Sequence, residues 1–280
     1  MAPLIHGKTS LIAHLGYPTE AFKAPMIYNP WFAQRGIDAV VVPMGIRAPD
    51  YPLLLQGLAC LTNLTGALVT MPHKVSTLAL VAQATPQARI AGACNALKLL
   101  PDGSWLGAQF DGDGFVRGVL RKGRTVAGAA VFISGCGGVG SAIAASFAAA
   151  GVGRLGLYDV HGAAADALRE RLLQHHPALD VRVGSPDPAG HAIVVNATPL
   201  GMRAGDPLPL DIERVARDAL VGEVVMSSEH TPLLQAALAR GCAVQVGTDM
   251  LFEMIPAYLE FFGFGTAAPD ELRAAAQIRY

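Results

Sequence analysis

Short apolar runs alternate with longer amphipathic segments along most of the chain. Runs of this kind, rich in Val, Ile, Leu and Ala, are typical of strands that are buried on both faces of a parallel sheet. Several of the intervening segments end at a glycine, as at Gly36 and Gly241, which is typical of a helix C-terminus. The alternation therefore predicts an α/β fold. The predicted strands cover residues 9–15, 38–44, 66–70, 131–134, 155–158, 180–183, 191–195, 221–226 and 243–246.

One stretch in the first half breaks this alternation. Residues 95–100 and 105–110 are extended runs joined by the turn-forming sequence Pro101–Ser104, which predicts a β-hairpin and hence a mixed sheet. The second half keeps the regular alternation and predicts a doubly wound sheet of the Rossmann type. A chain of 280 residues can hold two such domains. The expected divisions are residues 1–112, residues 113–247, and a C-terminal helical segment over residues 248–280.

The second domain is organised around Val131–Gly151, where an apolar run meets a glycine-rich turn and an Ala-rich segment. The turn reads G-C-G-G-V-G over residues 135–140. Glycines can take positive φ and let a pyrophosphate lie against the backbone at the positive end of a helix. A second apolar run ends in Asp159, about where a Rossmann unit places its ribose-binding carboxylate. The pattern predicts a dinucleotide site, and a glycine turn that binds nothing remains the alternative.

The composition excludes several classes of partner. The chain is 52% hydrophobic and 15% charged with a net charge of −1, so it has no basic field for nucleic acid. Its four cysteines are scattered without C-x-x-C spacing, which fits reduced thiols in the cytoplasm better than a zinc site or disulfides. No stretch resembles a membrane helix or a signal peptide. We expect a cytoplasmic, unprocessed protein without a nucleic-acid or membrane partner, and the oligomeric state stays open, a homodimer included.

The end of the third predicted strand carries candidate chemistry. Pro72 suits the first turn of a helix, so His73 and Lys74 should lie at the helix start, beside the carboxyl end of the strand. A lysine there opposes the helix dipole at a cost of roughly 0.3–1 kcal/mol. Either Lys74 is fully solvated or it has a functional role, and the sequence leaves both readings open.

Other polar residues give weaker signals. Asp111 and Asp113 flank a glycine in a D-G-D-G turn, which is too sparse a ligand set for a metal ion, so we expect no metal. Among the histidines only His73 is expected near the candidate site, and as the neighbour of Lys74 it should point elsewhere. The isolated histidines show no liganding pattern; they are His14, His161, His191 and His230.

Taken together, these segments resemble the shikimate dehydrogenases. Residues 69–74 read V-T-M-P-H-K against the family's V-T-x-P-x-K, and residues 92–95 read G-A-C-N against G-A-x-N. Asp111–Gly112 matches D-G, and residues 135–138 resemble the turn G-A-G-G. The motifs N-A-T-x-x-G-M and T-P-L-L follow at residues 196–202 and 231–234. The order and spacing of these motifs match over nearly the whole chain, which is more specific than any one of them.

The resemblance implies roles for individual residues. Lys74 and Asp111 match the catalytic lysine and aspartate, and Thr70 and Asn95 match groups that hold the substrate's hydroxyls. The first domain would bind substrate, the second would bind NAD(P), and the C-terminal helices would fold back on the first domain. The cofactor-binding positions implied in the same way are Gly135, Gly137, Gly138, Val139, Asp159, Asn196, Thr198, Met202, Val224 and Gly247.

The departures from the family lie at the other end of the substrate. Where the family has H-S-x-S-P, with two serines that bind a carboxylate, this chain has A-F-K-A-P over residues 21–25, so Phe22 and Ala24 replace the serines. Met226 and Met254 stand where the family has a substrate-facing tyrosine and glutamine. Each partner lost by a buried charged group costs roughly 1.5–3 kcal/mol. The pocket is therefore expected to be more apolar, unless Lys23 or a shift of the loop supplies a replacement donor.

The leading hypothesis is an oxidoreductase that transfers hydride reversibly between a nicotinamide cofactor and a cyclic secondary alcohol or its ketone. The candidate substrates are shikimate with 3-dehydroshikimate, quinate, or a less polar analogue. Lys74 would donate the proton to the reduced oxygen. Asp159 and Val160 stand where NADP-using relatives commonly have Asn-Arg, so NAD is expected rather than NADP. The alternatives are an NAD-binding regulator with little activity and a true shikimate dehydrogenase with an unusual carboxylate site.

Overall fold

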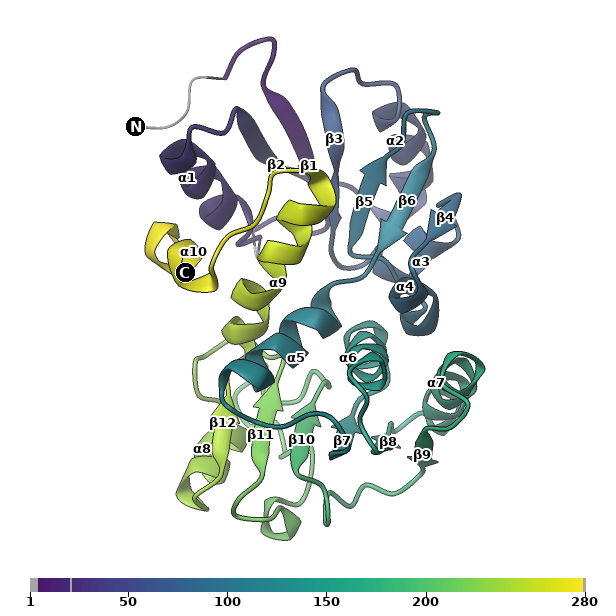
Figure 1. Cartoon of the computed structure of the whole chain (residues 1–280), viewed down its shortest axis with the longest axis vertical. Helices are drawn as coiled ribbons and strands as arrows, with labels where there is room; N and C mark the ends of the chain where they lie inside the picture. Colours follow the sequence, from purple (N-terminus) through teal and green to yellow (C-terminus); the bar gives the residue numbers. More distant parts are fainter. Residues whose placement is uncertain (1–4, 21, 279–280) are drawn as a thin grey trace. The chain divides into compact units, whose positions relative to one another are not determined.

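The structure is a computed structural model that describes residues 5–20 and 22–278. The chain forms two compact units, each with its own six-stranded sheet (Figure 1). The first unit comprises Met1–Phe110 with Ile255–Tyr280, and the second comprises Asp111–Met254. The α/β fold with one mixed and one parallel sheet is the predicted class. No helix in the described part of the chain combines the length and apolar character needed to cross a membrane.

The sheet of the first unit has the order β2-β1-β3-β5-β6-β4. Strand β1 pairs in parallel with β2 and β3, whereas β5 runs antiparallel to both β3 and β6, as the hairpin predicted. The strands are β1 (Ser10–Gly16), β2 (Ala39–Gly45), β3 (Leu64–Val69), β4 (Gln83–Ala84), β5 (Ala96–Leu99) and β6 (Trp105–Ala108). The helices are α1 (Pro25–Arg35), α2 (Tyr51–Leu58), α3 (Lys74–Leu78), α4 (Pro86–Ala91), α10 (Pro269–Ala275) and the last part of α9 (Gly247–Phe262).

The two faces of β1 pack against different helices. Ala13 and Leu15 belong to a buried cluster with Tyr51, Leu55 and Leu58 of α2. Because side chains alternate along a strand, Ile12, His14 and Gly16 point to the opposite face. On that face the ring of Phe262 in α9 fills the space over Gly66 of β3.

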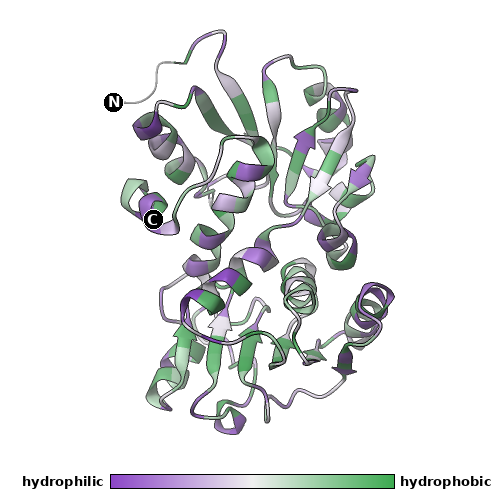
Figure 2. Ribbon diagram, viewed as in Figure 1, coloured by the Kyte–Doolittle hydropathy of each residue, from purple (hydrophilic) through white to green (hydrophobic). Residues whose placement is uncertain are grey.

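The second unit is a parallel sheet of order β12-β11-β10-β7-β8-β9. Apolar residues dominate its central strands, whereas α7 carries a mixed surface (Figure 2). The strands are β7 (Ala130–Ser134), β8 (Arg154–Tyr158), β9 (Asp180–Val183), β10 (Ile193–Asn196), β11 (Leu220–Glu223) and β12 (Ala243–Gln245). The helices are α5 (Asp111–Arg121), α6 (Gly138–Ala149), α7 (Gly162–His175), α8 (Pro232–Ala239) and the first part of α9.

Some boundaries differ from the sequence prediction. Asp50 is a residue type that caps helices, so the sequence predicts a helix that starts there and reaches about residue 62. In the structure α2 ends at Leu58, and the Asp50 side chain makes no capping hydrogen bond. The strand expected over residues 221–226 ends at Glu223, which leaves Met226 in the loop that follows β11. Short 3-10 turns at Ala48–Asp50 and Ile212–Arg214 replace part of the expected connections.

A close approach between two helices holds the second unit together. A Cβ atom added to Gly112 of α5 would overlap the carbonyl oxygen of Ala142 in α6. Ser146, one turn further along α6, donates a 2.9 Å hydrogen bond to Asp113. The start of α5 is therefore fixed on α6 by contact of backbone with backbone and by a side-chain hydrogen bond.

We predict that Gly112→Ala lowers the free energy of unfolding by about 1–3 kcal/mol, because the added methyl group would force the two helices apart. Gly57→Ala is the matched control, since Gly57 lies in α2 with open space around its Cα. Alanine is about 1 kcal/mol more favourable than glycine inside a helix, so the control should stabilise. Urea denaturation measures both, and a Gly112→Ala protein as stable as the parent would contradict the packing argument.

Candidate active site

Thr70 and Lys74 lie at the carboxyl end of β3. The Thr70 N–H donates to Leu15 O of β1 at 2.9 Å, and Lys74 is the first residue of α3. The carbonyl oxygen of Lys74 accepts a 2.8 Å hydrogen bond from Cys94 N, next to Asn95. These backbone bonds fix the start of α3 relative to two strands, while the Lys74 side chain stays half-buried.

His73 points away from Lys74, as expected. Its ring stacks on Tyr51 of α2, with centroids 4.1 Å apart, and its Nε2 lies 2.9 Å from Ile46 O. The Tyr51 hydroxyl lies 2.7 Å from Thr77 Oγ1, and burial raises the pKa of Tyr51 to about 12. His73 and Tyr51 thus anchor the helix that begins at Lys74, a role that the sequence did not reveal.

Asn95 is fully buried, and hydrogen bonds hold both its side chain and its backbone. Its Oδ1 accepts a 2.9 Å hydrogen bond from Phe110 N, and its carbonyl oxygen accepts one from the Tyr258 hydroxyl at 3.2 Å. Its Nδ2 has no hydrogen-bond partner among the described residues. An oriented buried amide with an open donor suits the binding of a ligand hydroxyl, the role implied by the resemblance.

The loop after β1 carries Phe22 and Ala24, while Ala21 lies outside the described residues. Ala24 is buried immediately before the first turn of α1. The tip of the Phe22 ring lies 2.9 Å from where a Cβ atom of Gly16 would stand, and the Thr70 methyl group lies 2.5 Å from the same point. Phe22 therefore meets Thr70 over Gly16, and an apolar ring stands beside the candidate substrate residues.

His14 corrects the expectation that only His73 lies near the site. Its ring stacks on Phe22 with centroids 4.1 Å apart, and only 7% of the residue is exposed. Burial, and to a smaller extent the charge of Lys74, lower the pKa of His14 to about 4. The imidazole is therefore neutral at neutral pH, and it lies within the field of the Lys74 ammonium.

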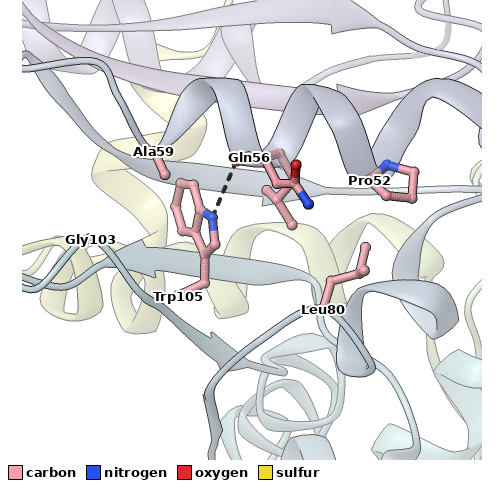
Figure 3. A pocket seen from close by; sticks show the side chains of 7 residues that line it. Pro52, Gln56, Ala59, Leu80, Gly103 and Trp105 are labelled. Atoms are coloured by element: carbon pink, nitrogen blue, oxygen red, sulfur yellow. Dashed lines mark hydrogen bonds between the residues drawn. The ribbon is translucent and has the colours of Figure 1, made fainter.

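A separate cavity of about 260 Å³ lies on the α2 side of the first sheet (Figure 3). Trp105 forms one wall, and its indole N–H donates to Leu55 O at 3.3 Å. None of the predicted site residues lines this cavity. The lining residues are Pro52, Leu55, Gln56, Ala59, Leu80, Gly103 and Trp105, which offer few polar groups to a hydroxylated ligand.

In the second unit the predicted cofactor residues gather at one edge of the sheet. Strands β7 and β10 are neighbours, with β8 and β9 on one side and β11 and β12 on the other. The order of the strands therefore reverses between β7 and β10, and ligands of open α/β sheets bind at such a switch point. Gly135, with φ of 99°, follows β7 there, and a Cβ atom added to it would overlap the backbone of Ala197 and Thr198 beyond β10.

The glycine turn fits a dinucleotide. Gly137 has open space where a Cβ atom would stand, and it precedes Gly138 and Val139 at the N-terminus of α6. Cys136 N donates a 2.7 Å hydrogen bond to Asp159 Oδ2, which ties the turn to the end of β8. Asp159 Oδ1 accepts from His161 N at 2.8 Å. The carboxylate is thus held beside the turn, where a ribose would lie next to the pyrophosphate.

Asn196 shapes the loop that faces this turn. Its Oδ1 accepts from both the N–H and the hydroxyl of Thr198, at 3.0 and 2.7 Å, and its Nδ2 donates to Leu200 O at 3.0 Å. Val224 N donates to Asn196 O at 3.2 Å, and Met202 lies exposed further along the loop. Asn196 is fully buried, so its side chain orients the loop, and Thr198 and Met202 are the groups presented at its surface.

Glu223 is a polar residue of this edge that the sequence did not single out. It is fully buried at the end of β11, next to Asn196 in the sheet, and it accepts a 2.9 Å hydrogen bond from the Thr231 hydroxyl. Burial raises the pKa of its carboxyl group, while the bonds with Thr231 and Asn196 oppose the shift. The signal in the sequence that could have identified Glu223 is an acidic residue within the apolar run of residues 219–226.

Asp111, Met226 and Met254 also belong to the second unit. Asp111 is buried at the start of α5, on the same face as Gly114, which packs against Met254 of α9. Met226 packs against Gly247 at the start of α9. The two methionines that replace polar residues of the family are therefore associated with the same helix, α9.

The chain is similar to shikimate dehydrogenases over nearly its whole length. The family described as the shikimate dehydrogenase substrate binding domain matches residues 15–97. The shikimate dehydrogenase (NADP(+)) of Rubrobacter xylanophilus is 37% identical over 253 residues, 89% of each protein, and that of Acidiphilium cryptum is 33% identical over 273 residues, 97% of each. The solved shikimate 5-dehydrogenase from Listeria monocytogenes, in complex with shikimate and NAD, shares the fold with a TM-score of 0.90, at 24% identity over 98% of both chains.

Proposed function

The chain belongs to the shikimate dehydrogenase family of nicotinamide-dependent CH–OH oxidoreductases, and we propose that it interconverts a cyclic secondary alcohol and its ketone with Lys74 as the proton donor and acceptor. The observation that carries this proposal is the ordered start of α3. Backbone hydrogen bonds to β1 and to the segment before β5 hold Thr70, Lys74 and Asn95 together within one unit.

The chemistry is divided between the cofactor and the side chains. When bound, the nicotinamide ring supplies or accepts the hydride. Lys74 gives a proton to the carbonyl oxygen during reduction and takes it back during oxidation. Asn95 donates from its open Nδ2 to a substrate hydroxyl, and Thr70 offers its own hydroxyl beside it. Asp111 accepts a hydrogen bond from the substrate hydroxyl.

The two units have separate roles in this proposal. The first unit, Met1–Phe110 with Ile255–Tyr280, binds the substrate through Thr70, Lys74 and Asn95. The second unit, Asp111–Met254, binds the cofactor through the glycine turn, Asp159 and the loop shaped by Asn196. All four cysteines are free thiols, three of them buried, which supports a cytoplasmic setting.

The substrate proposed is less polar than shikimate at the end away from Lys74. Phe22 stands beside Thr70 in the first unit, where a carboxylate would need hydroxyl donors, and the resemblance to the family assigns Ala24 to the same wall. Lys23 on the same loop has its pKa lowered by burial, so its charged form is less favoured there.

The cofactor proposed is NAD. The Asp159 carboxylate would accept hydrogen bonds from ribose hydroxyls and repel a 2′-phosphate, and Val160, where a guanidinium would be needed, is 81% exposed. Arg154 donates to Gly190 O and Arg182 pairs with Asp180, so both arginines are engaged elsewhere. The two relatives are named for NADP(+), whereas the Listeria enzyme was solved with NAD.

We predict that Lys74→Ala lowers kcat by about 10²–10⁴, the usual contribution of a general acid–base group, with little change in cofactor affinity. Lys98→Ala is the matched control, because Lys98 lies in the same unit with its ammonium over the Phe261 ring. NADH oxidation with a panel of cyclic ketones that includes 3-dehydroshikimate measures both. A decrease in kcat of tenfold or less for Lys74→Ala would mean that Lys74 is not the proton donor. A parent protein that binds cofactor but reduces none of the ketones would favour the regulator.

We predict a higher kcat/KM with NAD than with NADP, and a smaller ratio for Asp159→Ala. Because Asp159 also accepts from Cys136 N, Asp159→Asn is the second variant, which keeps an oxygen for that bond and removes the charge. It should improve NADP use more than it impairs NAD use. A parent enzyme that prefers NADP would overturn the assignment and point to Arg171, a half-buried cation of α7 that acts electrostatically on Cys136.

We predict that Phe22→Ser combined with Ala24→Ser raises kcat/KM for shikimate relative to uncharged cyclic alcohols, because two hydroxyl donors return beside the ring. Each hydrogen bond to a charged group is worth roughly 1.5–3 kcal/mol, so the ratio should move at least tenfold. Steady-state kinetics of the double variant and of each single variant test this. An unchanged ratio would mean that these two positions do not face the substrate.

A further inference from the structure

His14 is a polar side chain between apolar residues of β1. Its neighbours Ala13 and Leu15 pack into the core with α2, whereas His14 points to the other face of β1. The residue is 7% exposed, and its Nδ1 has no hydrogen-bond partner among the described residues. Buried polar atoms are nearly always hydrogen-bonded, so an open Nδ1 calls for a partner that the described residues do not provide.

The surroundings of His14 are those of the candidate substrate site. Phe22 stacks on one side of the imidazole, and the same Phe22 ring meets the Thr70 methyl group over Gly16. Gly16 is two residues from His14 on the same face of the strand. The ammonium group of Lys74 is close enough to act on the titration of His14. The open nitrogen therefore lies among the residues proposed to hold and protonate the substrate.

We propose that His14 Nδ1 forms a hydrogen bond with an uncharged hydroxyl group of the substrate, and that His14 and Phe22 together select a neutral polyhydroxylated ring over one that bears a carboxylate. The inference rests on the proposed function, because it assumes that the substrate lies beside Thr70 and Lys74. In this proposal His14 is the side chain that forms a polar contact with the substrate beside Phe22.

The chemistry of the imidazole favours a hydroxyl over a carboxylate. A neutral imidazole has one N–H donor and one bare nitrogen acceptor, and a hydroxyl can both donate and accept, so it satisfies Nδ1 in either tautomer. A carboxylate can only accept, and it needs several donors when it is removed from water. Of the surfaces beside His14, the Phe22 ring and the Thr70 methyl group offer none, and the Lys74 ammonium is assigned to the reacting oxygen.

Three ring ligands that differ at a single substituent test the proposal. They are shikimate, the alcohol in which a hydroxymethyl group replaces its carboxylate, and the analogue in which a methyl group replaces it. Binding of each to the full-length protein is measured by calorimetry without cofactor, so no turnover is needed. The proteins compared are the parent, His14→Leu, which keeps a side chain of similar bulk, and His14→Asn, which keeps a hydrogen-bonding atom near Nδ1. Thermal melts establish that each variant is folded.

The parent protein should bind the hydroxymethyl ring about tenfold more tightly than shikimate, the difference expected from one charged group with unmet partners. His14→Leu should weaken binding of the hydroxymethyl ring by about 3- to 10-fold, the value of one neutral hydrogen bond, and leave the methyl ring within about twofold. His14→Asn should recover most of the loss. A residue that only supports the fold would not change the binding of one ring and leave the binding of another unchanged.

Two results would overturn the inference. One is tighter binding of shikimate than of the hydroxymethyl ring by the parent protein, and the other is a His14→Leu effect that is equal for all three ligands. The proposed function fails separately. A protein whose His14 discriminates among the rings but which oxidises no cyclic alcohol would retain the binding role and lose the reaction. A protein that oxidises cyclic alcohols with His14→Leu unchanged toward every ring would retain the reaction and lose the binding role.

Discussion

Both candidate sites depend on close backbone approach at the carboxyl edge of a sheet. Parallel strands end at the same edge, so loops from different strands are brought together there. In the first unit, Gly16 leaves room for the Thr70 methyl group and the Phe22 ring at the end of β1. In the second, Gly135 leaves room for the backbone at Ala197 and Thr198. A side chain at either glycine would separate the loops that carry the candidate ligand-binding groups.

The fold class was predicted correctly because each helix and strand is indicated by the residues within it. Each buried strand is a short apolar run, and helix ends at Gly36 and Gly92 carry the positive φ that such glycines indicate. The predicted length of α2 was wrong because Asp50 does not cap and no glycine marks the end of that helix. Local signals therefore predict the elements well, and they fail where a boundary has no specific residue behind it.

The candidate site was predictable only in part, for a related reason. Lys74 and Asn95 lie in short motifs at the ends of strands, so their place at the sheet edge follows from the order of elements. His14 carries no such motif, because a single histidine in an apolar strand looks like a core residue. It lies near the candidate site because Phe22, from a loop, stacks on it and also meets Thr70, which follows another strand. No local pattern in the sequence encodes these contacts. The roles assigned to these residues stay predictions.

The site has two parts that differ in how firmly the fold holds them. Backbone hydrogen bonds to two strands fix Thr70, Lys74 and Asn95, so a change in this part would disturb the sheet itself. Phe22 and Ala24 belong to the loop between β1 and α1, where a substitution would alter the proposed wall of the substrate site and leave the strand pairing intact. If the proposed roles hold, substrate preference can change through the loop and through His14 while the proposed proton donor, Lys74, keeps its place. A conserved reaction with a new substrate is the outcome that this division of the site favours.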